Sequence, residues 1–439
     1  MTNRTNKVWP ALLMACALLG TAACDTDKLL EVNDPDLVTP DNVQGAKGAD
    51  LYWAGALGQF AQAFSSGTGG QALYSGMLAD EFHLSGTFPT RNEVDRREMD
   101  PRNGTLTGQY RSLHQARVGL KNAAERLAEF VPGDSRIAEM WNLNGFTYIF
   151  FAEHYCSGVP FGDTPNTGDV VQGTQTTTEQ MLQTAIERFN SAASNAAGSA
   201  DQANLAAIGL ARAQLNLGNY AQAASAVSGV PTSWSYIIRS KGGASTGQRN
   251  AIYEMNHSQR RWSLSDMEGG NGVAFRSQTD ARVPWEDSGQ NGFDEETRLY
   301  HQLKFGSWDD DVALASGVEA RLIEAEAQLQ NGNAAGMMAT LNALRATMSL
   351  DPLTDPGSTT ARQDLLFEER ARWLFGTAHR LGDLRRLVRQ YGRDQATVFP
   401  SGDFFKGGIY GSDVNFPVPF EESENPNVEP SNLCIDRNA

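Results

Sequence analysis

The chain has 439 residues, of which 40% are hydrophobic and 20% are charged, an ordinary balance for a globular protein with a sizeable core. Its formal net charge of −16 argues against DNA or RNA as a partner, because phosphate binding needs clustered Lys and Arg. Length alone allows about three domains, although repeat folds often run as one long body.

The N-terminus has the features of a targeting segment. Two basic residues precede an apolar run at 9–23, which is shorter than the roughly 20 residues of a membrane span. We interpret residues 1–23 as a signal peptide. Cys24 follows in a context that resembles the lipobox of bacterial lipoproteins and is the predicted lipid-attachment site; the alternative is a secretory signal without lipid. Residues 24–45, rich in Asp and Pro, form a predicted lipid-anchored tether.

Helical periodicity begins after this tether. Apolar residues recur at helical spacing in four stretches, 46–66, 71–82, 107–130 and 134–154. Turn residues dominate between 85 and 104. The sequence therefore predicts several helices joined by loops in this part of the chain.

The last of these helices carries a repeat signature. Trp141, Gly145 and Tyr148 have the spacing seen in tetratricopeptide repeats (TPRs), where the small Gly lets a neighbouring helix approach closely. One such match is weak by itself. With the repeat described next, it predicts an N-terminal helical part over residues 46–231 that contains TPR-like units.

One helix–turn–helix unit occurs at least twice. The stretch ARAQLNLGNYA at 211–221 aligns with AEAQLQNGNAA at 325–335, and seven of the eleven positions are identical, including the Gly-Asn turn. A single unit cannot bury its apolar face alone, so the units must stack. The copies are not contiguous, which predicts large insertions between them.

The main insertion spans residues 232–311 and holds four of the eight tryptophans. It has no long helical period, so we predict irregular loops with short strands, the kind of excursion on which binding tends to lie. Flat rings stack on the apolar faces of sugars, while amide and acid side chains bind the hydroxyls. The candidate ligand-binding residues are Trp262, Trp285, Trp308, Phe293 and Tyr300. The alternative is that these rings only pack the loops onto the helices.

Helical spacing returns in residues 312–391. A helical hairpin is predicted over 318–348, followed by one further helix whose apolar stripe runs over 366–388. Arg370 lies on that stripe, so we predict a Glu or Asp partner for it on a neighbouring helix. Residues 392–439 form a predicted loop-rich tail.

Signals for catalysis or metal binding are weak. Residues 243–247 match G-x-S-x-G, but they lie in a Gly-rich polar stretch, whereas that motif needs a strand before it and a helix after it. His379 and Asp383 are expected to pair and stabilise a helix rather than to act as an acid–base dyad. The three aspartates at 309–311 lack a calcium-loop pattern, which favours a solvated acidic loop. We predict no catalytic residue, no metal site and no cofactor.

The four cysteines have separate expected fates. Cys16 is removed with the signal peptide, and Cys24 carries the lipid. Because an exported protein meets oxidising conditions, we predict a disulfide between Cys156 and Cys434 that pins the tail to the helical body. The alternative is two buried free thiols.

The stretch EERARWLFGTAHRLGDLRR, residues 368–386, resembles the C-terminal core of the SusD/RagB-like nutrient-binding lipoproteins of the bacterial outer membrane. Nine residues match that pattern position by position: Glu369, Arg370, Leu374, His379, Arg380, Asp383, Leu384, Arg385 and Arg386. Five residues depart from it: Trp373, Thr377, Ala378, Leu381 and Gly382.

The repeats and this resemblance predict a mainly all-α fold, in which TPR-like helix pairs form a right-handed helical scaffold with large irregular loop insertions. The resemblance implies non-catalytic binding of a nutrient, a glycan or another oligomer, and its delivery to a SusC-like TonB-dependent transporter. It implies a lipid-anchored protein of the outer membrane that faces the cell surface. Two alternatives are a lipid-anchored glycoside hydrolase and a TPR scaffold that binds proteins.

Overall fold

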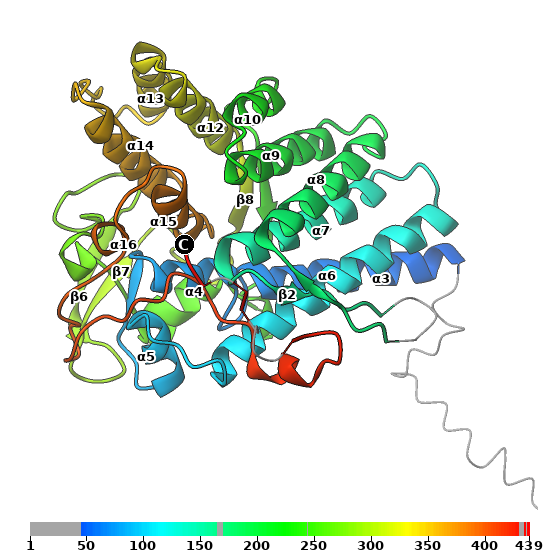
Figure 1. Cartoon of the computed structure of the whole chain (residues 1–439), viewed down its shortest axis with the longest axis horizontal. Helices are drawn as coiled ribbons and strands as arrows, with labels where there is room; N and C mark the ends of the chain where they lie inside the picture. The colour runs from blue at the N-terminus through cyan, green and yellow to red at the C-terminus, as the bar shows by residue number, and fades with distance from the viewer. Residues whose placement is uncertain (1–44, 165–169, 244, 430–433, 436) are drawn as a thin grey trace, which may run out of the picture. The chain divides into compact units, whose positions relative to one another are not determined.

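Long helices lie side by side along much of the chain and form its frame (Figure 1). The computed structural model describes residues 45–164, 170–243, 245–429, 434–435 and 437–439. The predicted signal peptide, Cys24 and the tether up to residue 44 lie outside the described residues. Among the described residues, none of the helices has the length and apolar content that crossing a membrane requires.

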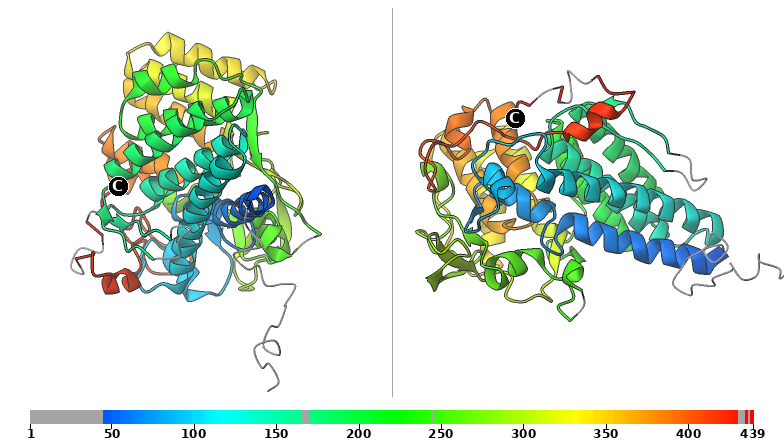
Figure 2. Two further views of the ribbon diagram at one scale, coloured as in Figure 1. Left: turned by 90° about the vertical axis from the view of Figure 1, so that its right-hand side faces the viewer. Right: turned by 90° about the horizontal axis from the view of Figure 1, so that it is seen from below.

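The helices of the frame pack in the order in which they follow one another along the chain, each against the next (Figure 2). They are α3 (Gly45–Phe64), α6 (Gly104–Phe130), α7 (Arg136–His154), α8 (Thr178–Ser194), α9 (Ala200–Asn216), α10 (Tyr220–Val227), α12 (Gly317–Gln330) and α13 (Ala334–Ala346). Side-chain caps help to fix where they begin: Asn103 accepts bonds from the first turn of α6, and Thr177 forms a capping box at α8. The predicted mainly helical fold with packed helix pairs is confirmed.

The repeated sequence unit is a helix pair in both places. α9 and α10 form the first copy, and α12 and α13 form the second. Gly218 and Gly332 stand at equivalent positions in the two turns, with φ of 78° and 73°, a conformation that costs Gly little. α10 packs against α12, so the two copies stack directly although about a hundred residues separate them in the sequence.

Two glycines allow α7 and α9 to approach α8. A Cβ at Gly145 would lie 2.7 Å from a ring carbon of Phe189, and a Cβ at Gly209 would lie 2.1 Å from the same carbon. Real Cβ atoms do not approach that closely, so only glycine fits on either side of this ring. The close approach predicted from Gly145 is confirmed.

The single helix predicted over 366–388 is wrong, because the structure has two helices, α14 (Thr359–Trp373) and α15 (Arg380–Arg389). Gly376 and Ala378 between them have φ of 69° and 61°, which ends an α-helix. The backbone N–H of Gly376 donates to the buried carboxylate of Glu81, 2.9 Å away. A contact from 295 residues earlier in the chain therefore holds the bend.

Arg370 has the acidic partners that its place on an apolar stripe predicts. Its guanidinium bonds Asp383 of α15 at 2.8 Å and lies 3.7 Å from Glu326 of α12. His379 and Asp383 do not pair, so that prediction is wrong. His379 lies in the bend, where its Nε2 is 3.1 Å from Glu319, while Asp383 is taken up by Arg370 and Arg386.

The insertion at 232–311 is built from loops and short strands, as predicted. Its strands are β4 (Ser235–Ile238), β5 (Trp262–Leu264), β6 (Trp285–Asn291) and β7 (Arg298–Gln302). Three antiparallel pairs tie it together and to the frame: β6 with β7, β4 with β8 (Val312–Ser316), and β5 with β1 (Phe82–Leu84). A fourth pair joins β2 (Val159–Pro160) to β3 (Gln175–Thr176).

Short helices fill the remaining connections. They are α4 (Gln71–Leu78), α5 (Pro89–Asp95), η2 (Thr246–Gln248), α11 (Ala251–Tyr253), η3 (Glu254–Ser258), η4 (Glu268–Gly270), α16 (Gln395–Val398) and η5 (Phe420–Glu424). α5 interrupts the predicted turn region, and Pro89 at its first position suits a helix start. Residues Gly45–Ala439 form one compact unit, so the domain boundaries at 231, 311 and 391 stay predictions.

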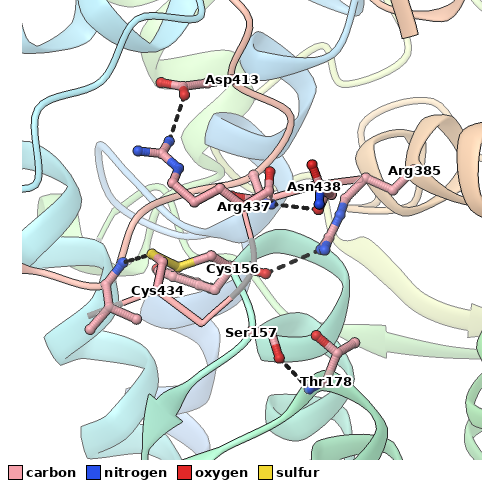
Figure 3. The surroundings of a disulfide bond; sticks show 11 residues. Cys156, Ser157, Thr178, Arg385, Asp413, Cys434, Arg437 and Asn438 are labelled. Atoms are coloured by element: carbon pink, nitrogen blue, oxygen red, sulfur yellow. Dashed lines mark hydrogen bonds and ion pairs between the residues drawn. A yellow bond between two sulfur atoms is a disulfide. The ribbon is translucent and has the colours of Figure 1, made fainter. Parts of the chain in front are cut away.

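Cys156 and Cys434 form a disulfide, as predicted (Figure 3). Their Cα atoms are 5.6 Å apart, within the usual range. Cys156 lies two positions after the end of α7, and its sequence separation from Cys434 is 278. Beyond the bond, Arg437 pairs with Asp413 at 2.7 Å, an ion pair that joins the end of the tail to an earlier part of the same tail.

Candidate functional site

A cleft of about 1060 Å³ is lined by residues that include members of α5 and β7. Figure 1 labels these two elements. We call this cavity the loop cleft. Three segments that are far apart in the sequence form its walls: the β1–α5 connection, the insertion from 266 to 300, and residues 403–410 of the C-terminal region. Side chains that line it include His83, Asp266, Arg276, Asp294, Tyr300, Phe405, Lys406 and Tyr410.

Two aromatic rings line this cleft from opposite ends of the sequence. Tyr300, half-buried on β7, carries the guanidinium of Arg276 at 3.6 Å from its ring centroid. Phe405 is 45% exposed, and its ring meets His83 edge-on at 4.9 Å. Its loop is narrow, because Asp403 pairs with Ile409 in an isolated bridge. Phe405 is therefore a large apolar ring that a ligand in the cleft can reach.

Charged side chains in the cleft are held in fixed positions. Lys406 Nζ donates to Asp294 Oδ2 at 2.6 Å and to the carbonyl of Gly86 at 2.9 Å, joining two walls of the cleft. Asp266 Oδ1 accepts the backbone N–H of Arg276 at 2.9 Å, which fixes the segment beneath the Arg276–Tyr300 stack. A ligand thus meets preorganised donors and acceptors rather than mobile chains.

Two buried acids, Glu268 and Asp95, lie at or next to the cleft, and Glu268 is one of its lining residues. Glu268 accepts a bond from the hydroxyl of Tyr410 at 3.0 Å and another from Ser265. Burial raises the pKa of Glu268, and the charge of nearby Asp95 raises it further. Burial also raises the pKa of Asp95, so the two carboxyl groups favour a shared proton.

The imidazole of His83 is neutral at pH 7. Burial, with the positive charges of Arg276 and Lys406, lowers its pKa to about 3. The His83 ring therefore offers the cleft a neutral hydrogen-bonding group.

Trp262 has to be corrected as a candidate ligand contact. Its side chain is 0% exposed, and it meets the rings of Tyr74 and Phe82 at 5.2 and 6.1 Å. β5, which begins at Trp262, pairs with β1 and turns this indole into the core. The alternative stated for such rings, packing of loops onto the helices, holds for Trp262.

The other candidates do not gather in one place. Trp285 meets Tyr300 edge-on at 5.9 Å across the β6–β7 pair. Trp308 stands apart, with Arg249 over its ring at 4.6 Å and its Nε1 donating to Glu254 at 2.6 Å.

Phe293 is 44% exposed and stacks on Arg261 at 3.7 Å, outside the lining of the loop cleft. Of the five predicted residues, the cleft is lined by Tyr300 alone.

Sequence reasoning missed Phe405, Lys406, Arg276 and His83 in the cleft. The paired phenylalanines Phe404-Phe405 between Gly402 and Gly407 carried a usable signal, because exposed aromatic residues in Gly-rich loops are candidates for binding. No pattern in the sequence indicates that this loop and Tyr300 line the same cleft.

Comparison with protein-family models finds no match, and comparison with curated protein sequences finds none either. Solved structures do match. A SusD superfamily protein from Parabacteroides distasonis has a TM-score of 0.66 at 13% identity, over 88% of this chain and 99% of that chain. A SusD-like carbohydrate-binding protein from Bacteroides fragilis has a TM-score of 0.64 at 14% identity, with the same coverage. A laminarin-binding SusD-like protein has a TM-score of 0.56 at 15% identity, again over 88% and 99%.

The chain has the SusD fold. Residues 368–386, the motif on which the resemblance rests, stabilise this fold through buried ion pairs with other parts of the chain. Arg380 pairs with Asp80 of the α4–β1 connection at 2.7 Å, and Glu369 pairs with Arg282 of the insertion. These side chains are buried, so the motif specifies how α14 and α15 pack and does not line the loop cleft.

Proposed function

We propose that this SusD-like protein binds a glycan in the loop cleft without changing it chemically. The observation that carries the proposal is the cleft itself, in which Tyr300 and the open ring of Phe405 lie among fixed polar side chains. Rings bind the apolar face of a sugar, and the polar groups bind its hydroxyls. Two proteins of the same fold, one described as carbohydrate-binding and one as laminarin-binding, support this choice by analogy of fold.

Replacing Phe405 with alanine should weaken glycan binding about tenfold, because the half-exposed ring contributes on the order of 1–2 kcal/mol when a ligand covers it. Tyr300→Ala should have a similar effect, since it also removes the support of Arg276. Isothermal titration with a panel of neutral oligosaccharides that includes laminarin fragments measures both.

Phe420→Ala is the matched control, because this ring is 38% exposed and lies outside the cleft lining. Equal affinities for all three variants and the unmodified protein would refute the site. Release of reducing ends from any oligosaccharide would instead favour the glycoside hydrolase alternative.

We further propose that the bound oligomer passes to a SusC-like TonB-dependent transporter of the outer membrane, while a lipid on Cys24 holds the protein at the cell surface. A transporter-sized β-barrel should then co-purify with the protein from detergent-solubilised membranes. Cys24→Ser should release the protein from the membrane fraction. A protein that stays membrane-bound without Cys24 and co-purifies with no barrel would contradict this part of the proposal.

A further inference from the structure

Two arginines and two exposed phenylalanines form a patch beside the loop cleft. Phe88 is 45% exposed and Phe293 is 44% exposed. The guanidinium of Arg261 lies between them, 4.8 Å from the ring centroid of Phe88 and 3.7 Å from that of Phe293. Arg91 lies over Phe88 as well, at 4.6 Å. We call these four residues the Arg–Phe patch.

One nitrogen of each guanidinium group in the Arg–Phe patch lacks a hydrogen-bond partner, although Arg91 also bonds the side chain of Tyr74. Nη1 of Arg91 and Nη1 of Arg261 are shielded from solvent and have no hydrogen-bond partner among the described residues. Neither arginine takes part in an ion pair of the described residues, although the chain carries a net charge of −16. Other arginines of this protein, such as Arg380 and Arg386, have carboxylate partners.

The two guanidinium groups also repel each other. Both stack on the ring of Phe88, so two positive charges share one small area of the surface. Burial and the charge of Arg91 lower the pKa of Arg261. An anion bound at the surface beside the two groups would offset this repulsion, because guanidinium groups bind carboxylate and sulfate through charge-assisted hydrogen bonds.

The Arg–Phe patch is continuous with the wall of the loop cleft. Phe88 stands between Thr87 and Pro89, and Phe293 directly precedes Asp294; these three neighbours all line the cleft. Lys406 clamps the two segments together through Gly86 and Asp294. The Arg–Phe patch therefore borders the cleft along two of the segments that form its walls.

We propose that the Arg–Phe patch binds the carboxylate or sulfate of an acidic glycan whose neighbouring sugar rings occupy the loop cleft. This proposal rests on the proposed function and names the class of its ligand. A glycan is favoured over an acidic protein segment because the patch continues the cleft, where rings and fixed polar groups suit sugars.

The test compares four probes by isothermal titration: an oligogalacturonate, the same oligomer with its carboxyl groups reduced, a sulfated oligosaccharide, and a poly-glutamate peptide. The double variant Arg91→Gln/Arg261→Gln should bind one or both acidic oligosaccharides at least tenfold more weakly. The carboxylate and sulfate arms show which anion the patch prefers. Binding of the reduced oligomer should change less than twofold, and added salt should weaken only the acidic probes.

Arg261→Lys and Arg239→Gln serve as controls. Lysine keeps the positive charge but lacks the planar set of donors of a guanidinium group, so Arg261→Lys should give an intermediate affinity. This variant can still test the proposal if the double variant does not fold. Arg239 is 83% exposed and lies outside the patch and the cleft, so its loss should have no effect.

Equal binding of the acidic and reduced oligomers, unaffected by the double variant, would overturn the acidic-glycan proposal and leave neutral glycan binding intact. Arginine-dependent binding of poly-glutamate alone would also overturn it, in favour of a protein partner. Failure of every oligosaccharide to bind would refute the proposed function together with this inference.

Discussion

Replacing Glu326 with alanine should lower the free energy of unfolding by about 3–5 kcal/mol, the usual cost of removing one partner from a buried ion pair. Glu326 is 0% exposed, and its carboxylate bonds Arg386 and the hydroxyl of Tyr391, the latter at 2.7 Å. Arg370 lies 3.7 Å away. Without Glu326, Asp383 alone would balance two buried guanidinium groups. Urea unfolding should show an earlier midpoint with an unchanged slope.

Glu324→Ala provides the matched control. Glu324 lies on the same helix, α12, and is partly exposed in a surface pair with Arg321 at 3.0 Å, so its loss should cost less than about 1 kcal/mol. Removing Arg386 together with Glu326 should cost less than the sum of the single changes, because Arg370 and Asp383 still balance each other. Similar losses for Glu324→Ala and Glu326→Ala would contradict a buried network.

Replacing Cys434 with alanine should cost about 2–5 kcal/mol of stability, the typical cost of losing a native disulfide. The bond closes a loop across a sequence separation of 278 residues, and long loops lose the most chain entropy when they are closed in the unfolded state. Cys434 is the better position to change, because it is half-buried whereas Cys156 is fully buried in the core.

Reductant supplies the control for this prediction. The unmodified protein in reductant should unfold at the midpoint of Cys434→Ala, and the variant should not respond to reductant. A chain that is equally stable with and without reductant would show that other contacts, such as the packing of buried Phe416 against Tyr155, hold the tail without the disulfide.

The helix pairs could be predicted because their signals are local. Helical spacing, a cap and a Gly at the turn lie within a few residues of one another, as at Gly218 and Gly332. That Arg370 has an acidic partner could be predicted, since a buried charge requires a counter-charge. Its identity was not, because Glu326 and Asp383 reach it from two other helices.

The bend between α14 and α15 shows where local signals fail. The apolar stripe continues through Gly376 at helical spacing, and yet the chain turns there. The bend is held by Glu81, which lies far away in the sequence and accepts the Gly376 N–H. Periodicity carries no information about such a contact.

The candidate site depended even more on distant contacts. Trp262 and Phe405 are both aromatic residues in segments that the sequence predicts to be loop-rich, and Trp262 is fully buried whereas Phe405 is 45% exposed. The difference arises because β5 pairs with β1, whereas the loop of Phe405 pairs only within itself.

The sequence by itself determined the helical frame, its repeated pairs and the resemblance to SusD-like proteins, since these rest on spacing along the chain. Only the tertiary structure decided which rings face solvent and which three segments meet at the loop cleft. The physical reason is that exposure and convergence are set by packing between residues hundreds of positions apart, which no short sequence pattern encodes.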